Sequence, residues 1–265
     1  VHVALAMAEM KLKPILFAFW GGPTGEWIQT ECRKTGINPK GIEVDGWNRN
    51  CYTFKSENPK YDETEILGAG PLITEDEEIA FFHEYKRLVK DCSIVTMSGS
   101  WPKGASDKGY QQLINQSLKA KVFLDCTGQQ FKNALDARPY GIHLNATEAN
   151  ELLNIDNPVK AAAKLQHYCS LAAVTAGKDG LYLAVGRPEV IHANIEITKC
   201  KSAVGSGDCL LAGLAIATYY GYNAEDTARL GVACGAANCL REDLGMLNKE
   251  NVEHLFHKVR ISYIA

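Results

Sequence analysis

The sequence lacks the features of a membrane-spanning or disulfide-stapled protein. No apolar run approaches the roughly 20 residues that cross a bilayer, and residues 1–9 contain no basic region of the kind that begins a signal peptide. The nine cysteines are an odd number without a C-x-x-C pair, which argues against a disulfide framework. We therefore expect a cytoplasmic protein with reduced thiols and no membrane partner.

An excess of charge of one sign is also missing. Lys plus Arg number 28 and Asp plus Glu number 31, which gives a formal net charge of −3. Such a balance offers no field for a polyphosphate backbone, so nucleic acid is not expected as a partner. Hydrophobic residues make up 46% of the 265 residues and charged residues 22%, close to the globular average. This length and composition predict one large domain with a sizeable core.

Short apolar runs alternate with amphipathic stretches along the chain. The runs look like buried parallel strands, and the stretches between them place apolar side chains on one helical face. This alternation predicts a doubly wound, mostly parallel α/β sheet. The expected strands are 14–20, 92–97, 121–125, 141–144 and 171–175, and the expected helices are 75–90, 106–118, 146–153 and 158–168.

Two segments depart from the alternation. Residues 1–10 look like the interior of a helix without a start signal, as though the sequence began inside an element. Within residues 42–72, extended pieces at 52–54 and 65–67 flank the polar residues 56–60, which predicts a hairpin outside the main sheet. Connections of this size in a compact α/β domain are usually lids or binding flaps.

Residues 202–208 (SAVGSGD) form the segment with the most chemical content. Small residues at the start of a helix let backbone N–H groups point at an anion such as a transferring phosphoryl group. Asp208 would lie beside that anion, where its most plausible role is a base acting on a nucleophile. From the residues alone, an N-cap in a Gly-rich turn explains the segment equally well.

Several motifs in order resemble one enzyme family. Residues 202–215 resemble the C-terminal signature of the ribokinase-like (phosphofructokinase B) sugar kinases, departing only at Ala203. Residues 144–148 (LNATE) resemble the family's N-x-x-E motif, and residues 175–180 (TAGKDG) resemble its nucleotide loop. Two further matches point to its hexose-phosphate kinases: residues 98–104 (SGSWPKG), and the Asn48-Arg49-Asn50 and Gly70-Pro71 pieces seen in 1-phosphofructokinases and tagatose-6-phosphate kinases.

The resemblance implies a single ribokinase-like domain over residues 1–265 with a β lid at about 42–72. It implies an ATP-dependent sugar kinase that transfers the γ-phosphoryl group to a hydroxyl of a phosphorylated ketohexose. Asp208 would be the general base. The amides of Gly205, Ser206, Gly207 and Asp208 would neutralise the charge that develops on the phosphoryl group.

The remaining implied roles concern ATP, Mg²⁺ and the acceptor. Thr175, Gly177 and Gly180 would let the backbone approach the nucleotide, although the G-x-x-G spacing also suits a hairpin turn. Asn145 and Glu148 would position Mg²⁺ and its waters, with a solvent-facing Glu as the alternative for Glu148. Arg49 and Ser98 would contact the phosphate on the sugar, and the alternatives are a solvated Arg49 and a Ser98 that only caps a helix.

The resemblance also has departures. His143 stands where the family more often has Lys, and a neutral, packed imidazole is its expected state. The family's first strand and its G-G-K-G-x-N loop have no counterpart before Val1, so we expect both to be missing from this sequence. The alternative functions are a kinase of an unphosphorylated sugar or nucleoside and a catalytically silent sugar-phosphate binding protein. The lid is a candidate surface for a homodimer, and His254-x-x-His257 looks like the polar face of the last helix rather than a metal site.

Overall fold

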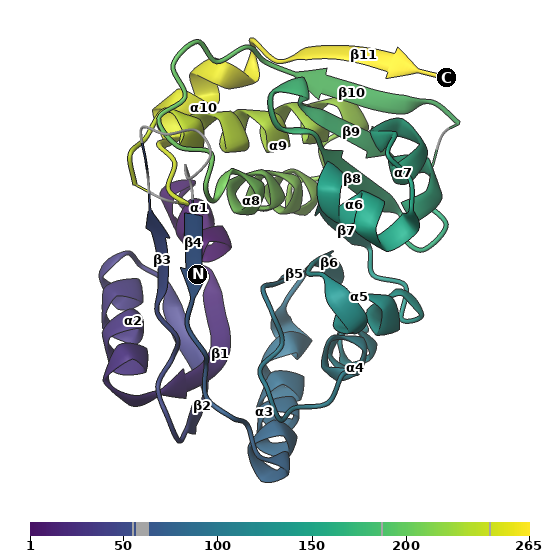
Figure 1. Cartoon of the computed structure of the whole chain (residues 1–265). Helices are drawn as coiled ribbons and strands as arrows, with labels where there is room; N and C mark the ends of the chain where they lie inside the picture. Colours follow the sequence, from purple (N-terminus) through teal and green to yellow (C-terminus); the bar gives the residue numbers. More distant parts are fainter. Residues whose placement is uncertain (55, 57–63, 187, 244) are drawn as a thin grey trace.

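The computed structural model describes residues 1–54, 56, 64–186, 188–243 and 245–265. A seven-stranded sheet with the order β11-β10-β9-β8-β7-β6-β5 lies at its centre, and two-stranded sheets are formed by β1 with β2 and by β3 with β4 (Figure 1). The strands of the large sheet are β5 (Ile94–Ser98), β6 (Lys121–Asp125), β7 (Gly141–Asn145), β8 (Leu171–Thr175), β9 (Leu181–Ala184), β10 (Val190–Asn194) and β11 (Arg260–Ile264).

The large sheet is parallel from β5 to β8 and antiparallel from β8 to β11. Its parallel strands are covered on both faces, which explains their nearly continuous apolar runs: Leu171 to Val174 are all buried. The four parallel strands confirm the expectation of a doubly wound α/β fold. The antiparallel strands follow residue 175, where the sequence analysis named no strand.

Helices cover both faces of this sheet. One face carries α1 (His2–Glu9), α8 (Ser206–Tyr219), α9 (Ala224–Cys239) and α10 (Lys249–Phe256). The other carries α3 (Glu75–Leu88), α4 (Gly109–Gln116), α5 (Gly128–Leu135), α6 (Ala146–Leu153) and α7 (Pro158–Leu165), with one-turn 3₁₀ segments at Val89–Asp91 and Gly177–Asp179. Each predicted helix exists, and α6 has the predicted bounds.

The N-terminal part forms its own β-α-β unit. Strand β1 (Ile15–Gly21) is followed by α2 (Gly22–Lys34) and pairs in parallel with β2 (Asn38–Val44). Residues 42–44, at the start of the segment of about 42–72 that was predicted as a lid, complete β2. The hairpin that was predicted as a lid is the antiparallel pair of β3 (Cys51–Phe54) and β4 (Thr64–Leu67). Of the polar residues predicted between its strands, 57–60 lie outside the described residues.

An apolar cavity of about 1190 Å³ lies between the β1–β2 sheet and the large sheet. Strand β1 contributes Ile15 to Trp20 to its lining and β5 contributes Ile94 to Ser98, so the cavity lies between the two strands. Within the described part of the chain, β1 pairs only with β2 and β5 only with β6. Strands β1 and β5 therefore lie on opposite sides of this cavity with an unpaired edge each.

Aromatic side chains on one side of this cavity tie the N-terminal unit to the large sheet. Phe19 of β1 stacks on Phe81 of α3 with ring centroids 4.0 Å apart. Trp101, in the loop that follows β5, meets Phe81, Phe82 and Tyr110. These contacts hold the 98–104 loop against α3 and beside β1.

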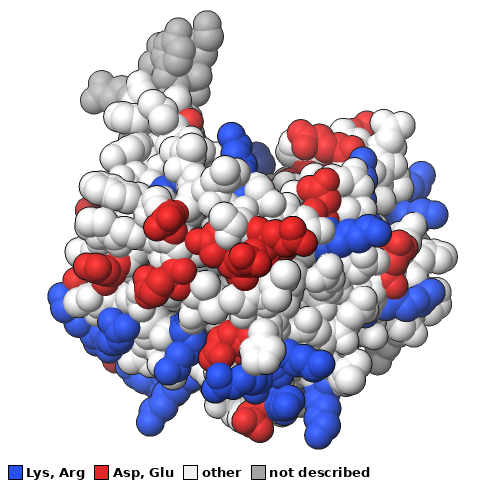
Figure 2. Space-filling model, turned by 90° about the horizontal axis from the view of Figure 1, so that it is seen from below, with Lys and Arg blue, Asp and Glu red and all other residues white. Residues whose placement is uncertain are grey.

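The surface seen from below carries charges of both signs. Asp and Glu side chains gather in the middle of this face, and Lys and Arg side chains lie around its lower border (Figure 2). Among the described residues, none of the helices combines the length and the apolar character needed to cross a membrane.

Candidate active site

The small-residue turn before α8 leaves the start of that helix open to a ligand. Gly205 is the N-cap with φ 81° and ψ 0°, a left-handed conformation that favours glycine. No side chain caps α8 within the described chain, so its first amides and the positive end of its dipole remain available to an anion. The Ser206 amide is an exception among the predicted donors, because it already donates to the Ala203 carbonyl at 3.0 Å.

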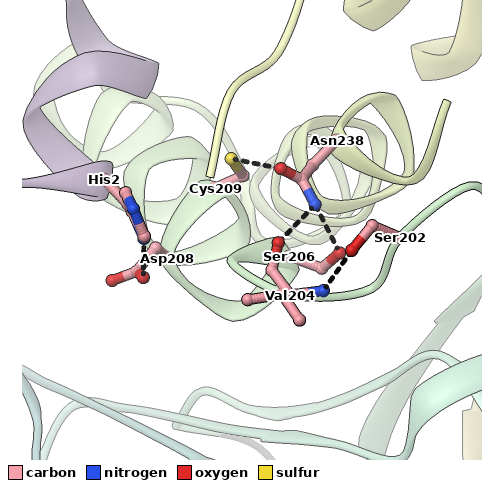
Figure 3. Close-up of polar contacts among 7 residues, drawn as sticks. All are labelled: His2, Ser202, Val204, Ser206, Asp208, Cys209 and Asn238. Carbon is pink, nitrogen blue, oxygen red and sulfur yellow. Dashed lines mark hydrogen bonds and ion pairs between the residues drawn. The ribbon is translucent and has the colours of Figure 1, made fainter. Parts of the chain in front are cut away.

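A buried asparagine from α9 supports this turn. Asn238 is fully buried, and its Nδ2 donates to the Val204 carbonyl and to the Ser206 hydroxyl, at 3.0 Å each (Figure 3). From within the turn, the Val204 amide donates to the Ser202 hydroxyl at 3.3 Å. The loop around the predicted anion site is therefore held in part by a side chain from another helix.

Asp208 lies in the first turn of α8, and a histidine from α1 points at it. His2 Nδ1 lies 3.3 Å from Asp208 Oδ2 (Figure 3). Both side chains are partly exposed, at 39% and 29%. Asp208 is therefore accessible to a ligand while one of its oxygens contacts the imidazole.

A second histidine lies beneath the turn, where three strands end. His143 of β7 is buried, with Nδ1 3.4 Å from Asp125 Oδ1 and Nε2 3.3 Å from the Thr175 hydroxyl. A Cβ added to Gly207 would lie 3.2 Å from its ring. This contact joins the carboxyl ends of β6, β7 and β8 to the start of α8, the kind of edge where open α/β sheets bind ligands.

The surroundings of this histidine oppose the neutral state expected from the sequence. Burial disfavours the imidazolium, but the carboxylates of Asp125, Glu148 and Asp208 outweigh it and raise the pKa of His143 above its ordinary value. The Asp125 contact becomes an ion pair when the imidazole is protonated. His143 is packed as expected, and its carboxylate neighbours favour a positive charge beneath the turn.

Asn145 and Glu148 form a reciprocal cap at the start of α6. The Glu148 amide donates to Asn145 Oδ1 at 2.9 Å, and the Asn145 amide donates to Glu148 Oε2 at 2.8 Å. This capping box accounts for the N-x-x-E spacing structurally. Glu148 is only partly exposed, so it is not simply solvent-facing. Burial raises the pKa of its carboxyl group, and the nearby charge of Asp125 raises it further.

These groups fit Mg²⁺ bound together with a triphosphate. The described residues include no group of three or more His, Cys, Asp or Glu side chains that could hold a metal ion alone. Mg²⁺ usually needs only one or two carboxylates because it keeps waters and binds substrate phosphates. The carboxylates of Glu148 and Asp125 repel each other, and a bound cation would reduce this repulsion.

The predicted nucleotide loop is the turn of a hairpin between β8 and β9. Gly177 has φ 54°, and a Cβ added there would meet no atom within 4 Å, so a ligand could approach its backbone. Gly180 has a different reason to be glycine, because an added Cβ would lie 2.3 Å from the Ala193 carbonyl of β10. Thr175 ends β8 and pairs with Asn145 of β7, which places the two predicted cofactor residues side by side.

Arg49 and Ser98 line the cavity between β1 and β5. The Asn48 side chain holds the loop that carries Arg49, since Nδ2 donates to the Phe19 carbonyl at 3.0 Å and Oδ1 accepts from the Gly21 amide at 2.8 Å. Lys103, which sequence analysis did not select, lines the same cavity. The cavity lining thus includes a guanidinium, an ammonium and a hydroxyl, groups of the kind that bind a phosphate ester.

The cavity and Asp208 are linked through α1. Val1 and Val3 line the cavity, and His2 between them contacts Asp208. A smaller cavity of about 450 Å³ contains none of the predicted site residues. Sequence analysis missed His2 and Asn238, and no local pattern marks them, because they reach the turn from positions distant in the sequence.

Comparisons with known proteins identify related chains. Residues 3–250 match the family described as pfkB family carbohydrate kinase. A tagatose-6-phosphate kinase of Staphylococcus epidermidis is 26% identical over 272 residues, which cover 98% of this chain and 86% of the relative. A structure of phosphofructokinase-2 from Escherichia coli in complex with substrates and products superposes with a TM-score of 0.86 at 21% identity, covering 97% of this chain and 86% of that one.

Proposed function

The chain belongs to the pfkB family of carbohydrate kinases, and from that premise we propose that it transfers the γ-phosphoryl group of ATP to a hydroxyl of a phosphorylated ketohexose. The observation that carries the proposal is the cavity lined by Arg49, Lys103 and Ser98, linked through α1 to Asp208 at the uncapped start of α8. The cations suit the phosphate already on the sugar, and the carboxylate suits its free hydroxyl.

In the proposed reaction, the acceptor hydroxyl oxygen attacks the γ-phosphorus and its proton passes to Asp208 as the bond to ADP breaks. The open amides at the start of α8 stabilise the charge on the transferring group. Asn145 donates its Nδ2 hydrogens to phosphate oxygens, because its Oδ1 is engaged with the Glu148 amide. Glu148 and its waters would hold Mg²⁺, which when bound neutralises charge on the phosphates.

An acceptor panel tests the proposal directly. Phosphate transfer from ATP is measured with matched pairs, such as a ketohexose and its 6-phosphate and 1-phosphate esters, at fixed Mg²⁺ and ionic strength. We expect kcat/KM to be far higher for an ester than for the free sugar. Equal values for esters and free sugars would favour a kinase of unphosphorylated sugars, and no transfer to any acceptor would favour a silent binding protein.

The Arg49→Ala variant tests which residue recognises the phosphate. A charge-assisted hydrogen bond to a phosphate contributes ~1.5–3 kcal/mol, so we expect kcat/KM for the ester to fall by about one to two decades and that for the free sugar to change little. Arg87→Ala is the matched control, because Arg87 is an exposed arginine of α3 that pairs with Glu84. An equal loss for ester and free sugar would exclude Arg49 from phosphate recognition.

Two further proposals concern a strand in the cavity and the oligomeric state. The cavity between the unpaired edges of β1 and β5 has the place and apolar lining for a further parallel strand, which we propose is the N-terminal strand expected from the family resemblance. A version extended upstream of Val1 should then protect the β1 and β5 amides from hydrogen exchange.

The lid exposes apolar side chains on both of its strands, including Tyr52, Phe54, Ile66 and Leu67. A two-stranded hairpin that buries so little is marginal on its own, so we propose that a second copy of the chain covers it in a cytoplasmic homodimer. One of the E. coli phosphofructokinase-2 structures is described as a tetrameric inhibited form. Sedimentation of an Ile66→Glu variant would test this interface, with a monomer as the expected result.

A further inference from the structure

His2 contacts the proposed base although no motif includes it. Its Nδ1 lies 3.3 Å from Asp208 Oδ2, and the two residues are 206 positions apart in the sequence. The side chains come from different helices, α1 and α8, and they point toward each other in Figure 3. The contact is therefore a product of tertiary packing and not of a local turn.

Two glycines fix the position of the His2 ring. A Cβ added to Gly245 would lie 2.2 Å from His2 Cγ, so the loop there can lie against the imidazole only as glycine. A Cβ added to Gly205 would in turn lie 2.4 Å from the Gly245 Cα. The His2 ring, the Gly245 backbone and the Gly205 turn thus form one stack, which sets the imidazole at a defined place beside the start of α8.

We propose that His2 is a positioning residue for Asp208: its Nδ1–H donates to Oδ2 and leaves Oδ1 to take the proton of the acceptor hydroxyl. The Asp208 carboxylate is partly exposed at the start of α8 and could present either of its two oxygens to a ligand. In this proposal, the contact with the imidazole holds it in one orientation. The inference rests on the proposed function, since it assigns Asp208 the role of base.

We expect loss of the His2–Asp208 hydrogen bond to lower kcat and to leave substrate binding nearly unchanged. Loss of a hydrogen bond to a charged group in the reacting state lowers the rate by about 10- to 100-fold. His2 has no direct role in holding nucleotide or sugar in this proposal, so the Kd for ATP and the KM for the acceptor should stay within about threefold of the wild-type values, a spread expected of a side chain outside the binding contacts.

The experiment compares three substitutions of His2 in the intact protein. His2→Phe keeps a ring against Gly245 and removes the donor, His2→Ala removes both, and His2→Asn restores a short N–H donor. We expect kcat to fall about 10- to 100-fold in the Phe and Ala variants and to recover in the Asn variant. His254→Phe in α10 is the control for an unrelated, exposed histidine, with unchanged kcat.

A spectroscopic measurement tests the contact without catalysis. In protein labelled with ¹⁵N-histidine, the His2 Nδ1 resonance should shift in an Asp208→Asn variant and stay in place in an Asp243→Asn control. Wild-type kcat in His2→Phe, or a His2 resonance unmoved by Asp208→Asn, would overturn the inference. Absence of transfer by the wild-type protein to every acceptor would instead count against the proposed function, while the resonance would still decide whether the contact exists.

Discussion

At the scale of single residues, Asp208 carries the most specific chemical expectation. We expect Asp208→Asn to lower kcat by roughly 10²- to 10⁴-fold, because the amide keeps the shape of the carboxylate but cannot take a proton from the acceptor hydroxyl. Nucleotide affinity, measured by titration calorimetry, should change little. A loss of turnover below about tenfold would contradict the assignment of Asp208 as base.

Asn238 provides a second test at this scale. Its Nδ2 donates to the Val204 carbonyl and the Ser206 hydroxyl inside the core, so Asn238→Leu leaves both acceptors without this partner. We expect the free energy of unfolding to fall by about 1–3 kcal/mol, measured by chemical denaturation, with a weaker affinity for ATP because the turn loses its support.

The matched control is Asn133→Leu, since the Asn133 Nδ2 makes the same kind of bond to the Asp107 carbonyl at 2.9 Å, but that bond is exposed. Its unfolding free energy should stay within about 0.5 kcal/mol of wild type, as is usual for surface positions. Equal losses in the two variants would mean that burial does not set the importance of the Asn238 bonds.

At the scale of single elements, the start of α3 is stabilised by a capping box that depends on pH. Glu77 Oε2 accepts from the amide and the hydroxyl of Thr74, at 2.7 Å each, and these bonds lower the pKa of Glu77 below its ordinary value of 4.5. A lowered native pKa stabilises the fold above pH 4.5, and the stabilisation is lost as pH falls through the native pKa.

We therefore expect Glu77→Ala to lower the free energy of unfolding by about 0.3–1.5 kcal/mol at pH 7, and the difference from wild type to shrink as pH falls below 4.5. Denaturant unfolding at several pH values measures this. Glu75→Ala, in the same first turn, removes the same charge and serves as the control. A difference that persists unchanged at pH 3 would show that the Glu77 carboxylate is not the stabilising group.

Elements with strong local signals could be predicted from the sequence. The run Leu171 to Val174 is buried on both faces of β8, so its continuous apolar pattern is a reliable strand signal. The start of α6 follows from the capping pair Asn145 and Glu148. Strand β2 (NPKGIEV) was missed because its Pro and Gly resemble loop residues, and pairing with β1 supplies the order that its own sequence does not.

The same distinction applies to the candidate site. Residues 202–208 could be selected because they are contiguous and the chemistry follows from their small side chains. The packing that supports them could not be predicted, since Asn238 lies 34 positions from Val204 and His2 lies 206 from Asp208. The positive charge favoured on His143 was missed for the same reason, because Asp125 reaches it from a neighbouring strand.

At the scale of the whole molecule, apolar burial is unevenly distributed. Two extensive clusters cover the faces of the large sheet. The cluster between α1, α2 and the β1–β2 unit contains only three fully packed side chains, Ala4, Cys32 and Ile37. We therefore expect amides of β1 and β2 to exchange with solvent before those of β7 and β8 in native-state hydrogen exchange, because local opening costs less where fewer apolar groups are buried. Equal rates would contradict this order.

The small core of the N-terminal unit has a consequence for ligand response. Loop 45–50, which carries Arg49, follows directly from β2, so any opening of the β1–β2 unit also displaces the proposed phosphate contact. A molecule that binds only the closed unit shifts the opening equilibrium by its own mass action, in proportion to ln(1 + [L]/Kd). A sugar phosphate would accordingly act as a structural ligand of this region, and its concentration would govern how long the β1–β2 unit survives a protease.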